Sequence, residues 1–168
     1  NLKKTSCTIK HITNLSATAK EVSITLDAPI DFVAGSFVNI FMDIDGKKVR
    51  RAYSIASSDR EQKQIAIAMR LNPTGTMSPF FWKHDMTGHK VEIMGPLGLN
   101  TAEKIKRETI YLFAFGVGAG VVKSLADHFS SLEYIKHLTI VTGSRTEDEI
   151  LYKQFFDELA NQHQKVQV

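Results

Sequence analysis

The periodicity of the apolar residues changes once along the chain, near residue 108, and this change most limits how the chain can fold. Before it, short runs rich in β-branched and aromatic residues alternate with turn residues, which is typical of an antiparallel barrel or sandwich. After it, apolar strands alternate with helical patterns, which predicts a parallel α/β unit. The sequence therefore predicts two units of different architecture.

The first part is expected to form strands at residues 7–12, 21–26, 36–44, 48–55, 64–71 and 90–94. Asp45-Gly46 separates two of these runs and predicts a tight hairpin, because glycine accepts the positive φ of a primed turn. One helix is expected at about 77–83, where Pro79 is tolerated because first-turn N–H groups have no intrahelical partner. We expect an antiparallel Greek-key β-barrel with one capping helix.

The second part opens with the continuous apolar run 110–115, which predicts a strand buried on both faces. A glycine-rich turn, a helical pattern through Val122, Leu125 and Phe129, a second strand at 138–141 and a second helix at about 148–159 follow. Residues 165–168 resemble the start of a third strand. We expect an incomplete Rossmann-like parallel sheet at 108–168, truncated after its third strand begins, with the barrel at 1–100 and the boundary in the polar segment 100–107.

Composition excludes some classes of protein and leaves others open. A single cysteine, Cys7, excludes an internal disulfide and a cysteine-ligated iron–sulfur cluster within the chain. No apolar run approaches the roughly 18 residues of a membrane span, and no signal segment is seen, so we expect no membrane span and a cytoplasmic location. The first residue, Asn1, indicates a processed form or part of a longer chain. The net charge of +3 fits either ordinary surface lysines or a docking face for an acidic protein.

Two further kinds of site are not expected. His84 and His89 are five residues apart, which is not the spacing of a helical metal-binding pair, so we predict no metal site. The basic run Lys47, Lys48, Arg50 and Arg51 lacks the interleaved aromatic residues that nucleic-acid binding uses, so it is interpreted as a solvated hairpin.

The densest chemical cluster is Arg51-Ala52-Tyr53-Ser54. A guanidinium suits a diphosphate because its rigid fork makes paired, charge-assisted hydrogen bonds. A tyrosine ring can stack on a flat heteroaromatic group. Alone, this tetrapeptide is a weak signal.

The pattern of a second cluster, residues 69–78, predicts a strand, a turn and the start of a helix. Helix N-termini favour bound phosphate, Gly75 would let the backbone approach an anion, and Ser78 could cap the helix or bind phosphate. Gly95-Pro96-Leu97-Gly98 ends the β-rich part. The turn containing Gly116 and Gly118 follows a strand where α/β domains bind nucleotide diphosphates.

Together and in this order, these clusters resemble the ferredoxin–NADP⁺ reductase family. Its Arg-x-Tyr-Ser, Gly-x-x-Ser and Gly-Pro-x-Gly motifs match residues 51–54, 75–78 and 95–98, and the segment 142–152 is similar to the family's segment after the second nucleotide-domain strand. The resemblance covers nearly the whole chain. It implies an oxidoreductase that binds FAD, with FMN the less favoured alternative, and uses NAD(P)H as co-substrate with a protein electron acceptor.

The resemblance also implies a role for individual residues. Arg51 would pair with the flavin diphosphate, Tyr53 would stack on the ring, and Ser54 would lie near its reactive N5. Ala52 is counted among the cofactor-binding residues, and the backbone of Met69, Arg70 and Leu71 would line the flavin ring and its ribityl side. Gly75, Thr76, Met77 and Ser78 would hold its phosphates. Ser144 and Arg145 would contact the adenosine end of the nicotinamide nucleotide, with NAD and NADP both left open.

The nucleotide turn departs from the family pattern at two positions. Gly116-Val117-Gly118-Ala119-Gly120-Val121 stands where the family has Gly-Thr-Gly-Ile-Ala-Pro, so Val117 lacks a hydroxyl and Val121 lacks the helix-starting proline. The altered turn and the incomplete α/β unit leave open a flavin-binding electron-transfer module without NAD(P)H turnover. A small-ligand-binding barrel without flavin is a separate alternative.

Overall fold

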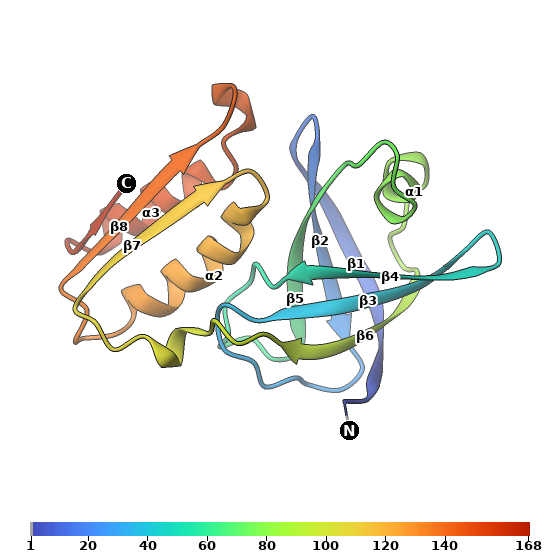
Figure 1. Ribbon diagram of the computed structural model, residues 1–168, viewed down its shortest axis with the longest axis horizontal. Helices are drawn as coiled ribbons and strands as arrows, with labels where there is room; N and C mark the ends of the chain where they lie inside the picture. Colours follow the sequence, from blue (N-terminus) through green and yellow to red (C-terminus); the bar gives the residue numbers. More distant parts are fainter. Residues whose placement is uncertain (1) are drawn as a thin grey trace.

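The computed structural model describes residues 2–168 as two separate sheets joined by one connection (Figure 1). The first sheet is antiparallel and has six strands in the order β4-β3-β6-β1-β2-β5. Its strands are β1 Lys4–Ser16, β2 Ala19–Leu26, β3 Phe37–Ile44, β4 Lys47–Ser54, β5 Gln64–Arg70 and β6 Lys90–Leu97. The six strands expected from the sequence are all present, and β1 is much longer than expected because it continues into a hairpin with β2.

The sheet closes into a barrel where its two edge strands meet. Ile55, just after β4, bridges Ile67 of β5, and the Ala56 N–H donates to the Ala66 carbonyl at 2.7 Å. The interior is filled by inward-facing aliphatic side chains from all the strands except β4, whose Val49 and Tyr53 pack against it only in part. The predicted antiparallel barrel is therefore confirmed.

The Asp45-Gly46 turn between β3 and β4 is also as predicted. Asp45 has φ 51° and Gly46 has φ 73°, so both central residues adopt the left-handed conformation of a primed hairpin. The turn pairs Ile44 with Lys47 and fixes the register that sets Ile40 opposite Arg51 and Val38 opposite Tyr53. The hairpin thus determines where the side chains of β4 lie.

Helix α1, Met77–Lys83, follows β5 and caps the barrel as expected. The proposed capping role of Ser78 is wrong, because Ser78 lies inside the first turn, and its buried hydroxyl accepts the Asn72 N–H at 2.8 Å. Ser78 instead ties the helix to the turn that precedes it.

The second sheet is parallel, with β7 Thr109–Phe115, β8 His137–Gly143 and β9 Val166–Gln167 in that order. Helices α2, Gly118–Ser130, and α3, Lys153–Gln162, connect the strands, and short 3₁₀ turns occur at η1 Ala102–Lys104 and η2 Glu147–Glu149. The expected Rossmann-like parallel unit is confirmed. None of the helices in residues 2–168 is long and apolar enough to span a membrane.

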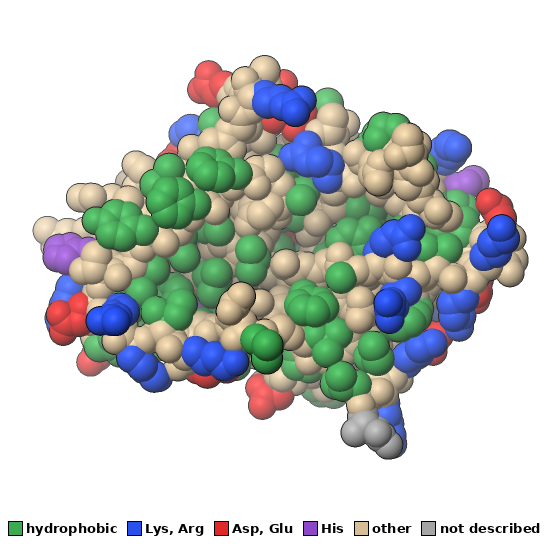
Figure 2. Space-filling view, viewed as in Figure 1, with side chains coloured by type: hydrophobic (Ala, Val, Ile, Leu, Met, Phe, Trp, Pro, Cys, Tyr) green, Lys and Arg blue, Asp and Glu red, His purple; other side chains and the backbone are tan. Residues whose placement is uncertain are grey.

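The prediction that the run 110–115 is buried on both faces is wrong. Burial alternates along β7: Ile110, Leu112 and Ala114 are buried, whereas Tyr111 and Phe113 are 63% and 59% exposed. Within the described residues, α2 and α3 pack on one face of the sheet only (Figure 1). Figure 2 shows the resulting row of hydrophobic side chains on the uncovered face.

The expected start of the second helix, at about Asp148, is also wrong. Residues Glu147–Glu149 form η2, and α3 begins only at Lys153 after Tyr152, which has a left-handed φ of 61°. The acidic residues resemble a first helical turn in sequence. The carboxylate of Glu149 is bonded to the barrel instead, and this holds the segment out of the helix.

The two units pack closely across α2. A Cβ added at Gly120 would lie 3.0 Å from the Ala68 Cβ and 3.2 Å from the Ala56 Cβ, so the helix meets the barrel through small residues. Polar contacts reinforce this packing: His128 to Asp59 at 2.7 Å, Arg60 to Asp127 at 2.9 Å, and the Tyr152 hydroxyl to Glu21 at 2.6 Å. The connection itself is anchored, since the N–H of buried Ala102 donates to the Ala34 carbonyl at 2.9 Å. The division into domains 1–100 and 108–168 stays a prediction.

The close approach at Gly120 gives a testable prediction. Gly120→Val should lower the free energy of unfolding by about 1–3 kcal/mol, because the new side chain would overpack the contact with Ala56 and Ala68. Denaturant unfolding measures the change. Gly118→Val is the matched control, since a Cβ at Gly118 in the same helix meets nothing within 4 Å. Equal stabilities of the two variants would contradict the proposed packing.

Candidate cofactor and nucleotide site

A basic cleft of about 610 Å³, here called the hairpin cleft, lies beside the β3–β4 hairpin. Its lining includes Arg51 of β4 and Thr76, the residue just before α1, so the predicted guanidinium and the predicted helix start face one shared space. Lys47, Lys48 and Arg50 line the same cleft. The sequence interpretation of these cations as a solvated hairpin missed this grouping, because nothing local shows that α1 lies opposite.

Arg51 is available to an anion in this cleft. Its side chain is exposed, and its guanidinium donates to the Arg50 carbonyl at 2.7 Å. Among residues 2–168 no carboxylate lies within ion-pairing distance of Arg51, whereas Lys48 pairs with Glu92 at 3.3 Å. A cleft with several cations and few carboxylates suits a diphosphate.

Tyr53 follows Arg51 by two residues and is half-buried against the barrel core. Burial raises the pKa of Tyr53 to about 12, while the neighbouring Arg51 charge opposes this shift. The phenol is therefore protonated at neutral pH and offers a neutral ring. Ala52 and Ser54 alternate with it and are exposed.

The other residues of the predicted flavin site, from Met69 to Ser78, differ in which of their atoms a ligand could contact. The Met69 side chain is fully buried in the barrel core, so only its backbone can face a ligand. The Leu71 N–H donates to the Thr18 carbonyl at 2.9 Å. Within Gly75–Ser78, Met77 and Ser78 are buried and Thr76 is exposed, so Thr76 offers the accessible side chain at the helix start.

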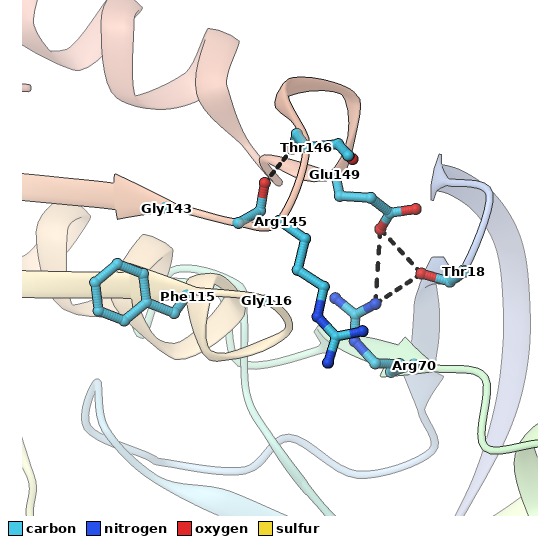
Figure 3. A pocket seen from close by; sticks show the side chains of 9 residues that line it. Thr18, Arg70, Phe115, Gly116, Gly143, Arg145, Thr146 and Glu149 are labelled. Carbon is cyan, nitrogen blue, oxygen red and sulfur yellow. Dashed lines mark hydrogen bonds and ion pairs between the residues drawn. The ribbon is translucent and has the colours of Figure 1, made fainter.

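A second cleft of about 930 Å³, here called the interdomain cleft, lies between the barrel and the α/β unit (Figure 3). It brings together four predicted residues from three separate segments: Arg70, Gly116, Ser144 and Arg145. Gly118 is not among its lining residues and instead begins α2. Of the predicted residues, Arg51 and Thr76 line the hairpin cleft and these four line the interdomain cleft, and the remaining predicted residues line neither: Ala52, Tyr53, Ser54, Met69, Leu71, Gly75, Met77, Ser78 and Gly118.

Five residues of the interdomain cleft were not predicted as site residues: Thr18, Phe115, Gly143, Thr146 and Glu149. The last three lie in the segment 142–152, whose resemblance to the family assigned a role only to Ser144 and Arg145. Phe115 lies at the end of β7, and its ring covers Gly143, where an added Cβ would come within 2.6 Å of it. Thr18 belongs to the β1–β2 turn, far away in sequence. Only the tertiary fold brings these segments together.

The charges of the second cleft are partly paired. Glu149 accepts hydrogen bonds from the hydroxyls of Ser16 at 2.8 Å and Thr18 at 2.9 Å, and its carboxylate lies 3.6 Å from the Arg70 guanidinium. The two hydroxyls and, to a lesser extent, Arg70 lower the pKa of Glu149. Arg145 has no carboxylate partner among residues 2–168, and the Ser144 hydroxyl donates to the Thr146 carbonyl. One guanidinium is therefore uncompensated in the cleft.

Residues 6–101 match the family model described as the oxidoreductase FAD-binding domain, which is more than half of the chain. The chain belongs to this family of ferredoxin reductase-like flavoproteins. The barrel is thus an FAD-binding domain. Arg51 and the Thr76 helix start share a cleft that fits a diphosphate, and the neutral Tyr53 ring, outside that cleft on the same strand as Arg51, fits a flat ring system.

Relatives of this flavoprotein include the reductase component DmpP of phenol 2-monooxygenase from Pseudomonas sp. strain CF600, which is 28% identical over 92% of this chain and 43% of that protein. NADH-cytochrome b5 reductase 1 of Dictyostelium discoideum is 29% identical over 80% of this chain and 47% of that protein. The Amycolatopsis cytochrome P450 reductase GcoB has the same fold, with a TM-score of 0.88, 22% identity and coverage of 99% of this chain and 50% of that one. The chain spans under half the length of these two curated relatives.

The raised pKa of Tyr53 predicts a specific alkaline weakening of the flavoprotein. An unfolded tyrosine loses its proton near pH 10, whereas folded Tyr53 keeps it until about pH 12, so stability is fully present below pH 10 and falls between these values. By pH 11 the apoprotein should lose about 1 kcal/mol more than Tyr53→Phe loses, after allowing for partial exposure. Denaturant unfolding at pH 9 and 11 measures this, with exposed Tyr111 changed to Phe as control. Identical pH dependence of the parent and Tyr53→Phe would refute the assignment.

Proposed function

We propose that the chain is the FAD-binding barrel and the first half of the NAD(P)-binding unit of a flavin-dependent oxidoreductase. The protein passes hydride or electrons between NAD(P)H, FAD and an electron acceptor such as ferredoxin, flavodoxin or an oxygenase component. The observation that carries the proposal is the shared cleft of Arg51 and Thr76 on a barrel of the FAD-binding family. When bound, FAD supplies the hydride and electron transfer, and the protein positions and shields it.

In this proposal the hairpin cleft holds the diphosphate of FAD. Arg51 binds the diphosphate through its free guanidinium, and the segment Gly75–Ser78 supports the phosphates at the start of α1. The protonated Tyr53 ring stacks on the flavin, and exposed Ser54 lies beside its reacting edge, so these two residues are assigned to the catalytic site. Ala52 and the backbone of Met69, Arg70 and Leu71 line the ring.

The interdomain cleft is assigned to the nicotinamide nucleotide. Arg145 and Ser144 lie at the carboxyl end of β8 and Gly116 at the carboxyl end of β7, which is the edge where parallel sheets bind nucleotides. Gly116 has φ 56°, and α2 begins two residues later at Gly118, so the turn leaves open backbone near the cleft. The charge of Arg145 suits a phosphate of the nucleotide.

A protein electron acceptor is supported by the names of relatives. These include the reductase component of phenol 2-monooxygenase and the reductase subunit of glycine betaine monooxygenase from Pseudomonas aeruginosa, the latter 30% identical over 80% of this chain. The net charge of +3 is compatible with an acidic partner. The cytoplasmic location stays a prediction.

The diphosphate contact gives a ranking of two variants. Arg51→Ala should weaken FAD affinity by about 1.5–3 kcal/mol, roughly 10- to 150-fold, because a charge-assisted contact to phosphate is lost. Tyr53→Phe should have a smaller effect, since the ring that stacks is retained. Flavin titration of the apoprotein measures both affinities, and Lys90→Ala, a barrel cation outside the cleft, is the control. Equal losses for Arg51→Ala and Tyr53→Phe would contradict the roles assigned here.

Reduction by nicotinamide nucleotides separates the proposal from its alternative. Full-length protein loaded with FAD should lose its visible flavin absorbance when NADH or NADPH is added without oxygen. The alternative, an electron-transfer module without NAD(P)H turnover, rests on Val117 and Val121 in the nucleotide turn. Flavin that stays oxidised with both nucleotides, yet is reduced by dithionite, would support that alternative.

A further inference from the structure

Glu149 is the residue of the interdomain cleft whose contacts cross from one unit to the other. It lies on η2, between β8 and α3 of the α/β unit. Its carboxylate oxygen Oε2 is bonded to barrel groups only: the Ser16 hydroxyl at 2.8 Å, the Thr18 hydroxyl at 2.9 Å and the Arg70 guanidinium at 3.6 Å. Glu149 of the α/β unit therefore pairs across the cleft with Arg70 of the barrel.

The two terminal nitrogens of the Arg70 guanidinium have different surroundings. Its Nη1 donates to the Thr18 hydroxyl at 2.6 Å and faces Glu149. Its Nη2 lies beside Gly116, where an added Cβ would come within 3.2 Å of it, so the missing side chain of this glycine leaves room for the guanidinium. Figure 3 shows Arg70 and Arg145 extending from opposite units into the same space.

We infer that Glu149 is a positioning residue that fixes the Arg70 guanidinium at the cleft, so that Arg70 and Arg145 together receive the phosphates of the nucleotide. This inference rests on the proposed nucleotide site. Arginine side chains lose much rotamer freedom when they are ordered, and a guanidinium already held by Thr18 and Glu149 has less freedom to lose when an anion arrives.

Two effects of Glu149 on an anionic ligand oppose each other. Its negative charge repels the anion, but that charge is already matched by Arg70 and by two hydroxyl donors, and the cleft is open to screening by water. The orienting effect acts directly on a phosphate-binding group. We therefore expect the loss of orientation to exceed the gain from reduced repulsion, so removal of Glu149 weakens binding.

The test uses FAD-loaded full-length protein and ADP-ribose as probe, with affinity measured by calorimetry. Glu149→Ala should weaken ADP-ribose binding about three- to tenfold, and Glu149→Gln should fall between it and the parent, because its amide oxygen still accepts from the hydroxyls. Asp148→Ala is the matched control, since Asp148 is an exposed carboxylate on the same turn. Flavin absorbance and melting temperature, measured on each variant, report a merely structural effect.

A double-mutant cycle tests whether Glu149 affects ADP-ribose affinity through Arg70. In the Arg70→Ala background, Glu149→Ala should change ADP-ribose affinity less than twofold. Two outcomes would overturn the inference but leave the nucleotide site intact. In one, Glu149→Ala has equal effects on affinity in both backgrounds. In the other, Glu149→Ala and Glu149→Gln bind ADP-ribose as tightly as Asp148→Ala does. Failure of the parent protein to bind ADP-ribose would refute the nucleotide site itself, and the inference with it.

Discussion

The seam between β4 and β5 is the constraint on which both clefts depend. The Ile55–Ile67 bridge and the Ala56–Ala66 hydrogen bond close the barrel there, which fixes β4 and its side chains beside β5. The same seam carries the small residues against which Gly120 of α2 packs. Closure of the barrel and docking of the α/β unit therefore use one surface, and the position of the hairpin cleft is linked to that of the interdomain cleft.

The two clefts share an electrostatic arrangement. In the hairpin cleft, Arg50 and Arg51 have no carboxylate partner among residues 2–168, while Lys48 pairs with Glu92. In the interdomain cleft, Arg145 has no such partner, while Arg70 pairs with Glu149. Exposed ion pairs contribute little to stability, so the Lys48–Glu92 and Arg70–Glu149 pairs are not expected to be important for the fold. A nucleotide entering either cleft meets two guanidiniums: Arg50 and Arg51 in the hairpin cleft, and Arg70 and Arg145 in the interdomain cleft.

Local sequence predicted those features that depend on local chemistry. The Asp45-Gly46 hairpin, helix α1 and the glycine turn before α2 follow from turn and helix-start preferences, and the structure has each of them. Sequence could not show that Thr76 faces Arg51, or that Thr18 and Glu149 meet Arg70, because these residues are brought together by tertiary packing. The burial of β7 was wrongly predicted because an apolar run does not show on which faces helices pack.

The error in the start of α3 has the same origin as the contact at Glu149. Acidic residues 147–149 satisfy the preference for negative charge in the first turn of a helix, so local energetics favour a helix there. Such preferences contribute only about 0.3–1 kcal/mol each. Two charge-assisted hydroxyl hydrogen bonds from the barrel to Glu149, each stronger than one such preference, exceed these preferences, so the segment forms a separate turn. The local rule fails at the point where the α/β unit contacts the cleft, which is where a functional contact is expected to override helix preference.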